Sequence, residues 1–81
     1  MTDAEIAERV REVIAETLDL AAGSLLDDAV LAVDLGVDSL AATELALVIE
    51  DEFAIRVPQD ERVDIVSVGD VIAMVRAKLR R

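Results

Sequence analysis

The chain has 81 residues with no cysteine and no histidine, and 54% of its residues are hydrophobic. Its 18 acidic and 8 basic residues give a formal net charge of −10. This composition excludes a disulfide framework and a cysteine-ligated zinc site, and the negative charge disfavours nucleic acid and anionic membranes as partners.

The short chain predicts one small cytoplasmic domain over residues 1–81. Its N-terminal stretch is acidic and lacks the apolar segment of a secretory signal. No stretch has the roughly 20 apolar residues that cross a bilayer, so membrane insertion is not expected. Met1 and the compact length favour a free-standing protein, and we expect a monomer.

The charge is unevenly distributed. Between Arg11 and Arg56 there is no Lys or Arg, whereas eleven Asp or Glu residues lie in that interval. A surface this negative attracts basic protein surfaces and speeds encounter with them. The alternative is that the charge only keeps the protein in solution, and composition alone does not decide between the two.

The first predicted helix runs from about Thr2 to Leu18. Its apolar residues recur at helical spacing and form one stripe, which consists of Ile6, Val10, Val13, Ile14 and Leu18. Thr2 and Glu5 have the spacing of a capping box, in which each side chain accepts a hydrogen bond from the other residue's backbone N–H.

A long connection follows, from about Asp19 to Val37. Connections of this length in a small domain are usually functional or well packed. Its apolar residues are expected to attach it to the core, and they are Leu25, Leu26, Val30, Leu31 and Leu35.

The second predicted helix begins at Ser39 and ends near Phe53, with Asp38 as its N-cap. One face is expected to point inward, and it consists of Leu45, Ile49 and Phe53 with Ala42 and Ala46 beside them. A second strip pairs apolar with acidic residues and contains no base, so we expect it to be exposed. This strip consists of Leu40, Glu44, Leu47 and Asp51.

After Pro58 the pattern predicts a short helical turn at about 60–63 and then a last helix with Ser67 as its N-cap. Ser67 and Asp70 have the spacing of a second capping box. An apolar stripe continues from there through Val68, Val71, Ile72, Val75 and Leu79. The predicted fold is therefore all-α: a small four-helix bundle with three longer helices, one short helix and a long loop between the first two.

Ser39 has no histidine or nearby lysine to act as a base, so catalysis by the chain itself is not expected. Its acidic residues lack the EF-hand pattern, and no metal site is predicted. Backbone N–H groups at the start of a helix favour a phosphate placed there. Ser39 is thus a candidate phosphate acceptor, where Gly36 permits close approach and Asp38 helps to hold a metal during transfer. An ordinary helix start is the alternative for an isolated Asp-Ser-Leu.

Several segments in order resemble those of acyl carrier proteins. The motif Leu-Gly-x-Asp-Ser-Leu is followed by an acidic close of the helix, an Ile-Arg-Val-Pro stretch and the start of the last helix. These segments cover nearly the whole chain and are Leu35–Leu40, Glu50–Phe53, Ile55–Pro58 and Asp64–Val71, with residues 10–20 matching the first helix.

The resemblance implies that a phosphopantetheinyl transferase moves 4′-phosphopantetheine from coenzyme A onto Ser39. Acyl groups would then travel as thioesters on the thiol that the cofactor supplies. Partners such as an acyltransferase or a ketosynthase would dock through basic residues onto the strip of Leu40, Glu44, Leu47 and Asp51. The candidates to shelter the acyl chain in the core are Leu45, Ile49, Phe53 and Ile72.

Two residues depart from the pattern of many fatty-acid carriers, since Ala41 and Arg56 stand where acidic residues are frequent. These departures count against a housekeeping fatty-acid role and leave polyketide or other specialised pathways open. An aminoacyl or peptidyl carrier is an alternative, although the Gly-Gly-x-Ser sequence usual there is absent. An acidic docking module without a cofactor also stays open and, more remotely, so does an enzyme that uses carboxylates.

Overall fold

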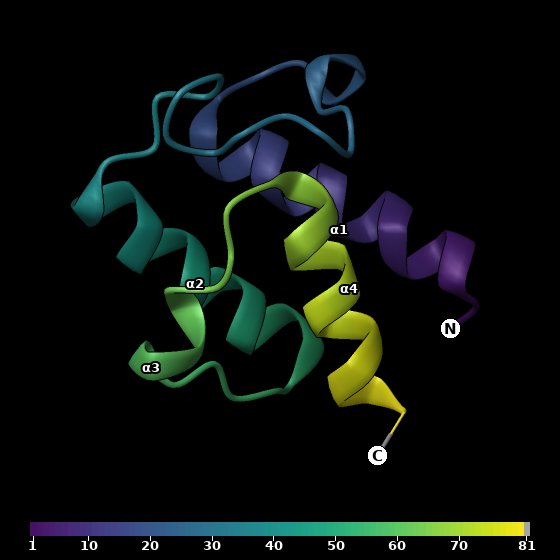
Figure 1. The fold of residues 1–81 in the computed structure, drawn as a ribbon. Coiled ribbons are helices and arrows are strands. Elements are labelled where there is room, and N and C mark those ends of the chain that lie inside the picture. The colour runs from purple at the N-terminus through teal and green to yellow at the C-terminus, as the bar shows by residue number, and fades with distance from the viewer. Residues whose placement is uncertain (81) are drawn as a thin grey trace.

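The computed structural model describes residues 1–80 and confirms an all-α bundle (Figure 1). Three longer helices and one short helix are present, as predicted. The elements are α1 (Asp3–Leu18), the 3₁₀ turn η1 (Ala22–Ser24), α2 (Ser39–Phe53), α3 (Gln59–Arg62) and α4 (Val68–Leu79). The turn η1 was not predicted. The predicted turn at 60–63 begins one residue earlier, at Gln59.

The N-terminus of α1 is closed by the predicted capping box. The backbone N–H of Thr2 donates to Glu5 Oε1 at 2.9 Å, and the N–H of Glu5 donates to Thr2 Oγ1 at 3.2 Å. The helix ends at Asp19, which adopts a left-handed conformation with φ 56° and donates its N–H to the carbonyl of Ala15.

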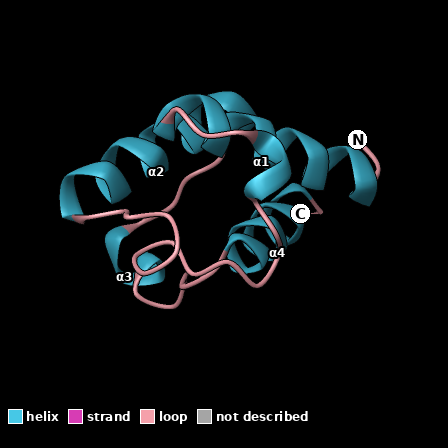
Figure 2. Cartoon of the chain, turned by 90° about the horizontal axis from the view of Figure 1, so that it is seen from above, coloured by secondary structure: helices cyan, strands magenta, loops and turns pink. Residues whose placement is uncertain are grey.

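The core lies where α1 contacts both α2 and α4. Val10 and Ile14 of α1 and Val68 and Val75 of α4 are fully buried there. Burying each such side chain contributes about 1.5–3 kcal/mol. In Figure 2, α1 and α2 lie on one side of the molecule and α3 and α4 on the other. Leu79, expected at the end of the α4 stripe, is 39% exposed and does not belong to the buried core.

The connection between α1 and α2 is attached to the core, but not by every apolar residue that was expected. Leu25 is buried and Leu31 and Leu35 pack against the core, whereas Leu26 is 65% exposed. Arg11 of α1 holds this segment, because its Nε donates to the carbonyl of Leu25 at 3.2 Å and its guanidinium pairs with Asp27.

The same connection passes over the N-terminal end of α4 (Figure 1) and forms hydrogen bonds with it. The N–H of Gly69 donates to the carbonyl of Asp27 at 2.8 Å, and the N–H of Val68 donates to that of Ala29 at 3.0 Å. A Cβ at position 69 would lie 3.0 Å from the carbonyl oxygen of Asp27, so a glycine permits this close approach.

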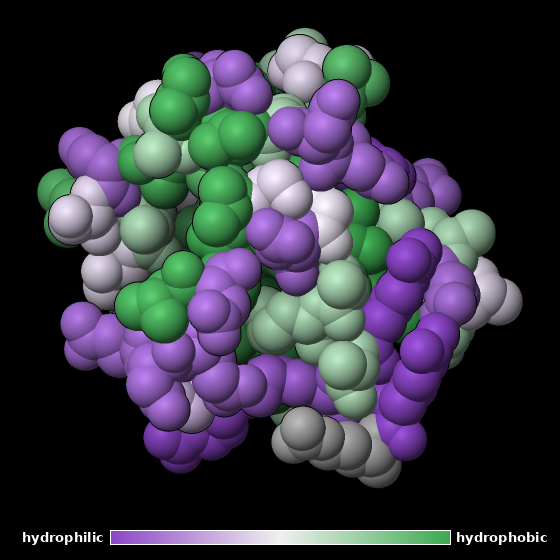
Figure 3. Space-filling view, viewed as in Figure 1, coloured by the Kyte–Doolittle hydropathy of each residue, from purple (hydrophilic) through white to green (hydrophobic). Residues whose placement is uncertain are grey.

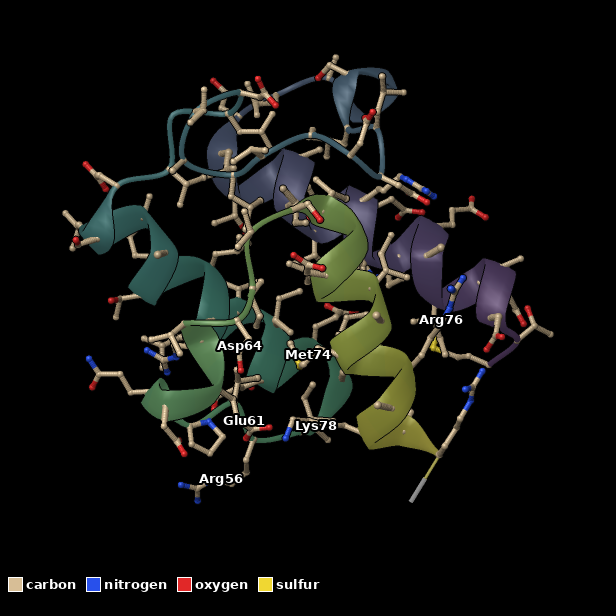
Figure 4. The ribbon with its side chains drawn as sticks, in the orientation of Figure 1. Arg56, Glu61, Asp64, Met74, Arg76 and Lys78 are labelled. Carbon is tan, nitrogen blue, oxygen red and sulfur yellow. The ribbon has the colours of Figure 1, made fainter. Side chains whose placement is uncertain are left out.

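Glu50 near the end of α2 organises the connection to α3. Its carboxylate Oε2 accepts a hydrogen bond at 2.7 Å from the N–H of Val57, which is almost fully buried. The short helix α3 is then held to α4 by an ion pair between Glu61 and Lys78 with an N···O distance of 3.0 Å. Figure 4 shows these two side chains meeting between the helices.

Candidate functional site

The first turn of α2 presents Ser39 to solvent, as the sequence predicts. Asp38 is the N-cap, and its Oδ1 accepts a hydrogen bond at 2.8 Å from the N–H of Ala41. The Ser39 side chain is exposed, and its hydroxyl has no hydrogen-bond partner among residues 1–80. The hydroxyl is therefore free to react with a group brought from outside.

The backbone around Ser39 offers a place for an anion. Within the described residues, no acceptor pairs with the N–H groups of Ser39 and Leu40. The first turn contains no acidic side chain, because Ala41 stands at the third helical position. Free N–H groups and the positive end of the helix dipole both favour a phosphate there.

Gly36 contributes to the site by its backbone conformation. Its φ is +68°, a left-handed value that glycine adopts without strain, and the space around its Cα is open. That Gly36 permits close approach of a group to Ser39 stays a prediction. In the described chain Gly36 turns the backbone, and buried Val37 next to it donates its N–H to the carbonyl of Leu31 at 2.9 Å.

The predicted strip on α2 is exposed over its whole length. Leu40 is 69% exposed and Leu47 is 56% exposed, although both are large apolar residues. Glu44 and Asp51 lie on the same face and form no ion pair among residues 1–80. The strip therefore presents two exposed leucines beside two carboxylates that have no ion-pair partner in the described chain.

An arginine of α1 neutralises part of the negative charge of α2. Arg9 forms two hydrogen bonds with Glu52, from Nε at 2.8 Å and from Nη2 at 2.9 Å. This contact lowers the pKa of the Glu52 carboxyl and raises that of Arg9. Sequence reasoning missed it, because the two residues are 43 positions apart and no local pattern joins them.

A cavity of about 80 Å³ lies between α2, α4 and the connections. Of the four residues expected to shelter an acyl chain, Leu45 and Ile49 line it, whereas Phe53 and Ile72 are buried elsewhere in the core. The other lining residues, which the sequence did not single out as a group, are Leu31, Val37, Ala42, Ala46, Val57, Arg62, Ile65, Val71 and Met74.

A more open groove of about 230 Å³ adjoins this cavity. The two share Leu31, Val37, Ala42 and Ile65. Ala42 is exposed, contrary to its expected place on the inward face, because the groove opens beside it. Ala42 follows Ser39 by three residues, so the groove comes within about one helical turn of the serine. Figure 3 shows apolar side chains gathered over the long connection and the α3–α4 connection.

No three Asp, Glu, His or Cys side chains within residues 1–80 cluster in a way that could hold a metal ion. Asp38 would therefore hold a metal only together with oxygen atoms supplied by a cofactor or another protein. In the described part of the chain, no helix has the length and apolar character needed to cross a membrane.

Comparison with known proteins agrees with this geometry. Residues 8–75 match the family described as "phosphopantetheine attachment site". Among solved structures, an acyl carrier protein from Enterococcus faecalis is similar, with 27% sequence identity and a TM-score of 0.79. The alignment covers 96% of this chain and 99% of that one. The chain thus belongs to the phosphopantetheine attachment site family and has the fold of an acyl carrier protein.

Proposed function

We propose that Ser39 carries 4′-phosphopantetheine and that the protein is a non-catalytic, cytoplasmic acyl carrier. The arm would hold acyl intermediates as thioesters and present them to separate enzymes of fatty-acid or polyketide biosynthesis. The observation that carries this proposal is the exposed, unbonded Ser39 hydroxyl at the open N-terminus of α2.

The attachment reaction needs a second protein. The Ser39 oxygen attacks the phosphorus of coenzyme A that bears the pantetheine, and the bond from that phosphorus to the second phosphate breaks. Adenosine 3′,5′-bisphosphate leaves, and the hydroxyl proton passes to a base. Because the chain has no histidine, a phosphopantetheinyl transferase would supply that base.

The phosphodiester that results would remain at the first turn of α2. There the free N–H groups of Ser39 and Leu40 face the charge, and Ala41 adds no repulsion. A negative group at an exposed helix N-terminus is stabilised by about 0.3–1 kcal/mol. The cofactor supplies the thiol that this cysteine-free chain lacks.

Docking of partner enzymes is proposed on the strip of Leu40, Glu44, Leu47 and Asp51. Glu44 and Asp51 form no ion pair within residues 1–80, whereas the neighbouring Glu52 of α2 is already neutralised by Arg9. A basic surface of a transferase, an acyltransferase or a ketosynthase would meet these charges and cover the two leucines.

The acyl group is proposed to enter the groove beside Ala42 and then the cavity lined by Leu45 and Ile49. The cavity of about 80 Å³ is smaller than the ~150 Å³ that admits benzene in an engineered apolar site. The cavity therefore suits a short acyl chain better than a long one, which would have to widen the core.

Mass measurement tests the attachment. The purified chain is incubated with coenzyme A and a broad-specificity transferase, and the expected result is one added phosphopantetheinyl group. Ser39→Ala should abolish the gain, and Ser24→Ala, a change at another exposed serine, should leave it intact. A gain that survives Ser39→Ala would contradict the proposal.

A second candidate function is an acidic docking module without a cofactor, and the exposed apolar and acidic strip favours it. Salt-sensitive partner binding that is unchanged by Ser39→Ala, in a protein that never gains the cofactor, would support this candidate. An aminoacyl carrier would instead gain the cofactor and accept an amino acid on its thiol.

A further inference from the structure

The cavity beside α2 contains one charged side chain in an otherwise apolar lining. Arg62, the last residue of α3, lines the cavity together with ten residues whose side chains are all apolar. It is partly buried there. A cavity meant only for hydrocarbon gains nothing from a guanidinium in its wall, since burial of an unpaired charge is costly.

Arg62 is fixed in place by the chain around it. Its Nε donates to the carbonyl of Val57 at 3.1 Å, and Val57 is itself held through its N–H by Glu50. One donor of the guanidinium is thereby used, and the position of the group beside the cavity is set.

The remaining donors of Arg62 have no protein partner in the described residues. No Asp or Glu oxygen lies within ion-pair distance of it there, although five of the other bases form ion pairs. Its neighbour Glu61 pairs with Lys78 instead. In a chain with 18 acidic residues, an unpaired arginine beside a cavity leaves its Nη groups available to a guest.

We propose that Arg62 selects acyl groups that carry an oxygen acceptor close to the thioester, such as a β-keto group, over fully reduced ones. This inference rests on the proposed attachment at Ser39. An acceptor oxygen in the cavity receives a hydrogen bond from a guanidinium Nη group. A hydrocarbon of the same length leaves that donor unpaired and is disfavoured.

The test compares two cargoes with the same carbon skeleton. A transferase loads Ser39 from butyryl-coenzyme A or acetoacetyl-coenzyme A, and mass confirms each loaded form. A cargo stabilises the fold only through contacts that it makes in the cavity, and only the acetoacetyl group offers an acceptor to Arg62. The Tm of the acetoacetyl form should therefore exceed that of the butyryl form by about 4 °C. Arg62→Met, which keeps an apolar stem but removes the donors, should abolish the difference.

Arg56→Met is the matched control, because Arg56 is exposed and forms no ion pair within residues 1–80. Figure 4 shows its side chain pointing away from the helices. In this variant the difference in Tm should persist. Should Arg62→Met fail to fold, the side-chain nitrogen resonances of Arg62 in the unaltered chain provide a second measurement. They should shift with acetoacetyl and not with butyryl.

Two outcomes would overturn the inference alone: loaded forms of equal Tm with unshifted Arg62 resonances, or a difference that persists in Arg62→Met. They would show that Arg62 only holds Val57 in place. A chain that gains no mass from either thioester would overturn the proposed attachment itself, and this inference with it.

Discussion

The helices α2 and α4 both begin at a polar N-cap, but their first turns are satisfied in different ways. At α4, Ser67 and Asp70 form the predicted capping box, and carbonyls of the long connection accept from the N–H groups of Val68 and Gly69. At α2, Asp38 satisfies Ala41, while the N–H groups of Ser39 and Leu40 have no acceptor within residues 1–80.

A serine at a helix start is therefore not by itself a site. Ser67 is partly buried, and its hydroxyl accepts from Asp70 N–H at 3.2 Å, so it is committed to the fold. The Ser39 hydroxyl forms no hydrogen bond in the described chain, and only the backbone carbonyl of Ser39 accepts one, from Thr43 Oγ1. What separates the two helix starts is the cover that the connection gives to α4 and withholds from α2.

The largest expected effect comes from removing that cover. Leu25→Ala should lower the free energy of unfolding by about 3 kcal/mol, because the side chain is only 2% exposed and anchors the connection to the core. Chemical denaturation measures the loss. The adjacent Leu26→Ala is the control, and it should stay within about 0.5 kcal/mol because Leu26 faces solvent. Equal losses of stability in Leu25→Ala and Leu26→Ala would contradict the finding that Leu25 is buried and Leu26 exposed.

The capping hydroxyl of α4 should matter less than the cover but still measurably. Ser67→Ala should lower the free energy of unfolding by about 1 kcal/mol, because the N–H of Asp70 then loses its acceptor. Ser39→Ala should leave the free energy of unfolding nearly unchanged, since its hydroxyl bonds to nothing within residues 1–80. Thermal unfolding of both variants measures the two losses of stability. A larger loss in Ser39→Ala than in Ser67→Ala would contradict the difference between the two helix starts.

The start of α4 should also make the stability of the fold depend on pH. Hydrogen bonds from the N–H groups of Val66 and Ser67 lower the pKa of Asp70 below its ordinary value of 3.8. A carboxyl with a lowered folded-state pKa stabilises the fold above the unfolded value, and this contribution is lost as pH falls through the folded one.

Stability should therefore fall on acidification below about pH 4, and Asp70→Asn should flatten part of that fall. Unfolding at several pH values between about 6 and 2.5 measures it. Asp51→Asn is the control, since Asp51 forms no hydrogen bond or ion pair in the described chain. A pH profile that Asp70→Asn leaves unaltered would show that the Asp70 contacts do not stabilise α4.

The smallest effect on stability is expected on the exposed strip of α2. Glu44→Lys or Asp51→Lys should change the free energy of unfolding by less than about 0.5 kcal/mol, yet lower kcat/KM of the transferase several-fold. Glu8→Lys, an equal charge change at an exposed position of α1, should have less effect on kcat/KM. Parallel losses of stability and of turnover would argue against a docking role.

The helices and their caps could be predicted from the sequence because they depend on local patterns. The pairs Thr2–Glu5 and Ser67–Asp70 each lie within one turn, and the apolar stripes repeat at the helical period. The connection carries no such period, so Leu25 and Leu26 could not be distinguished, and one of them is exposed.

The site was predictable in one part and not in another. The motif around Ser39 marked a possible attachment point, but the exposure of Ser39 depends on the long connection leaving the start of α2 uncovered. The pairing of Arg9 with Glu52 and the presence of Arg62 in the cavity depend on how distant segments pack together. For the same reason Phe53 and Ile72 joined the core and not the cavity lining.

Mass spectrometry of the protein purified from its native host, intact and after proteolysis, tests the central claim most directly. We expect a phosphopantetheinyl group, with or without an acyl cargo, on the peptide that contains Ser39 and an unmodified peptide around Ser67. A Ser39 peptide that is wholly unmodified, or a phosphopantetheinyl group on any other residue, would contradict the proposed attachment.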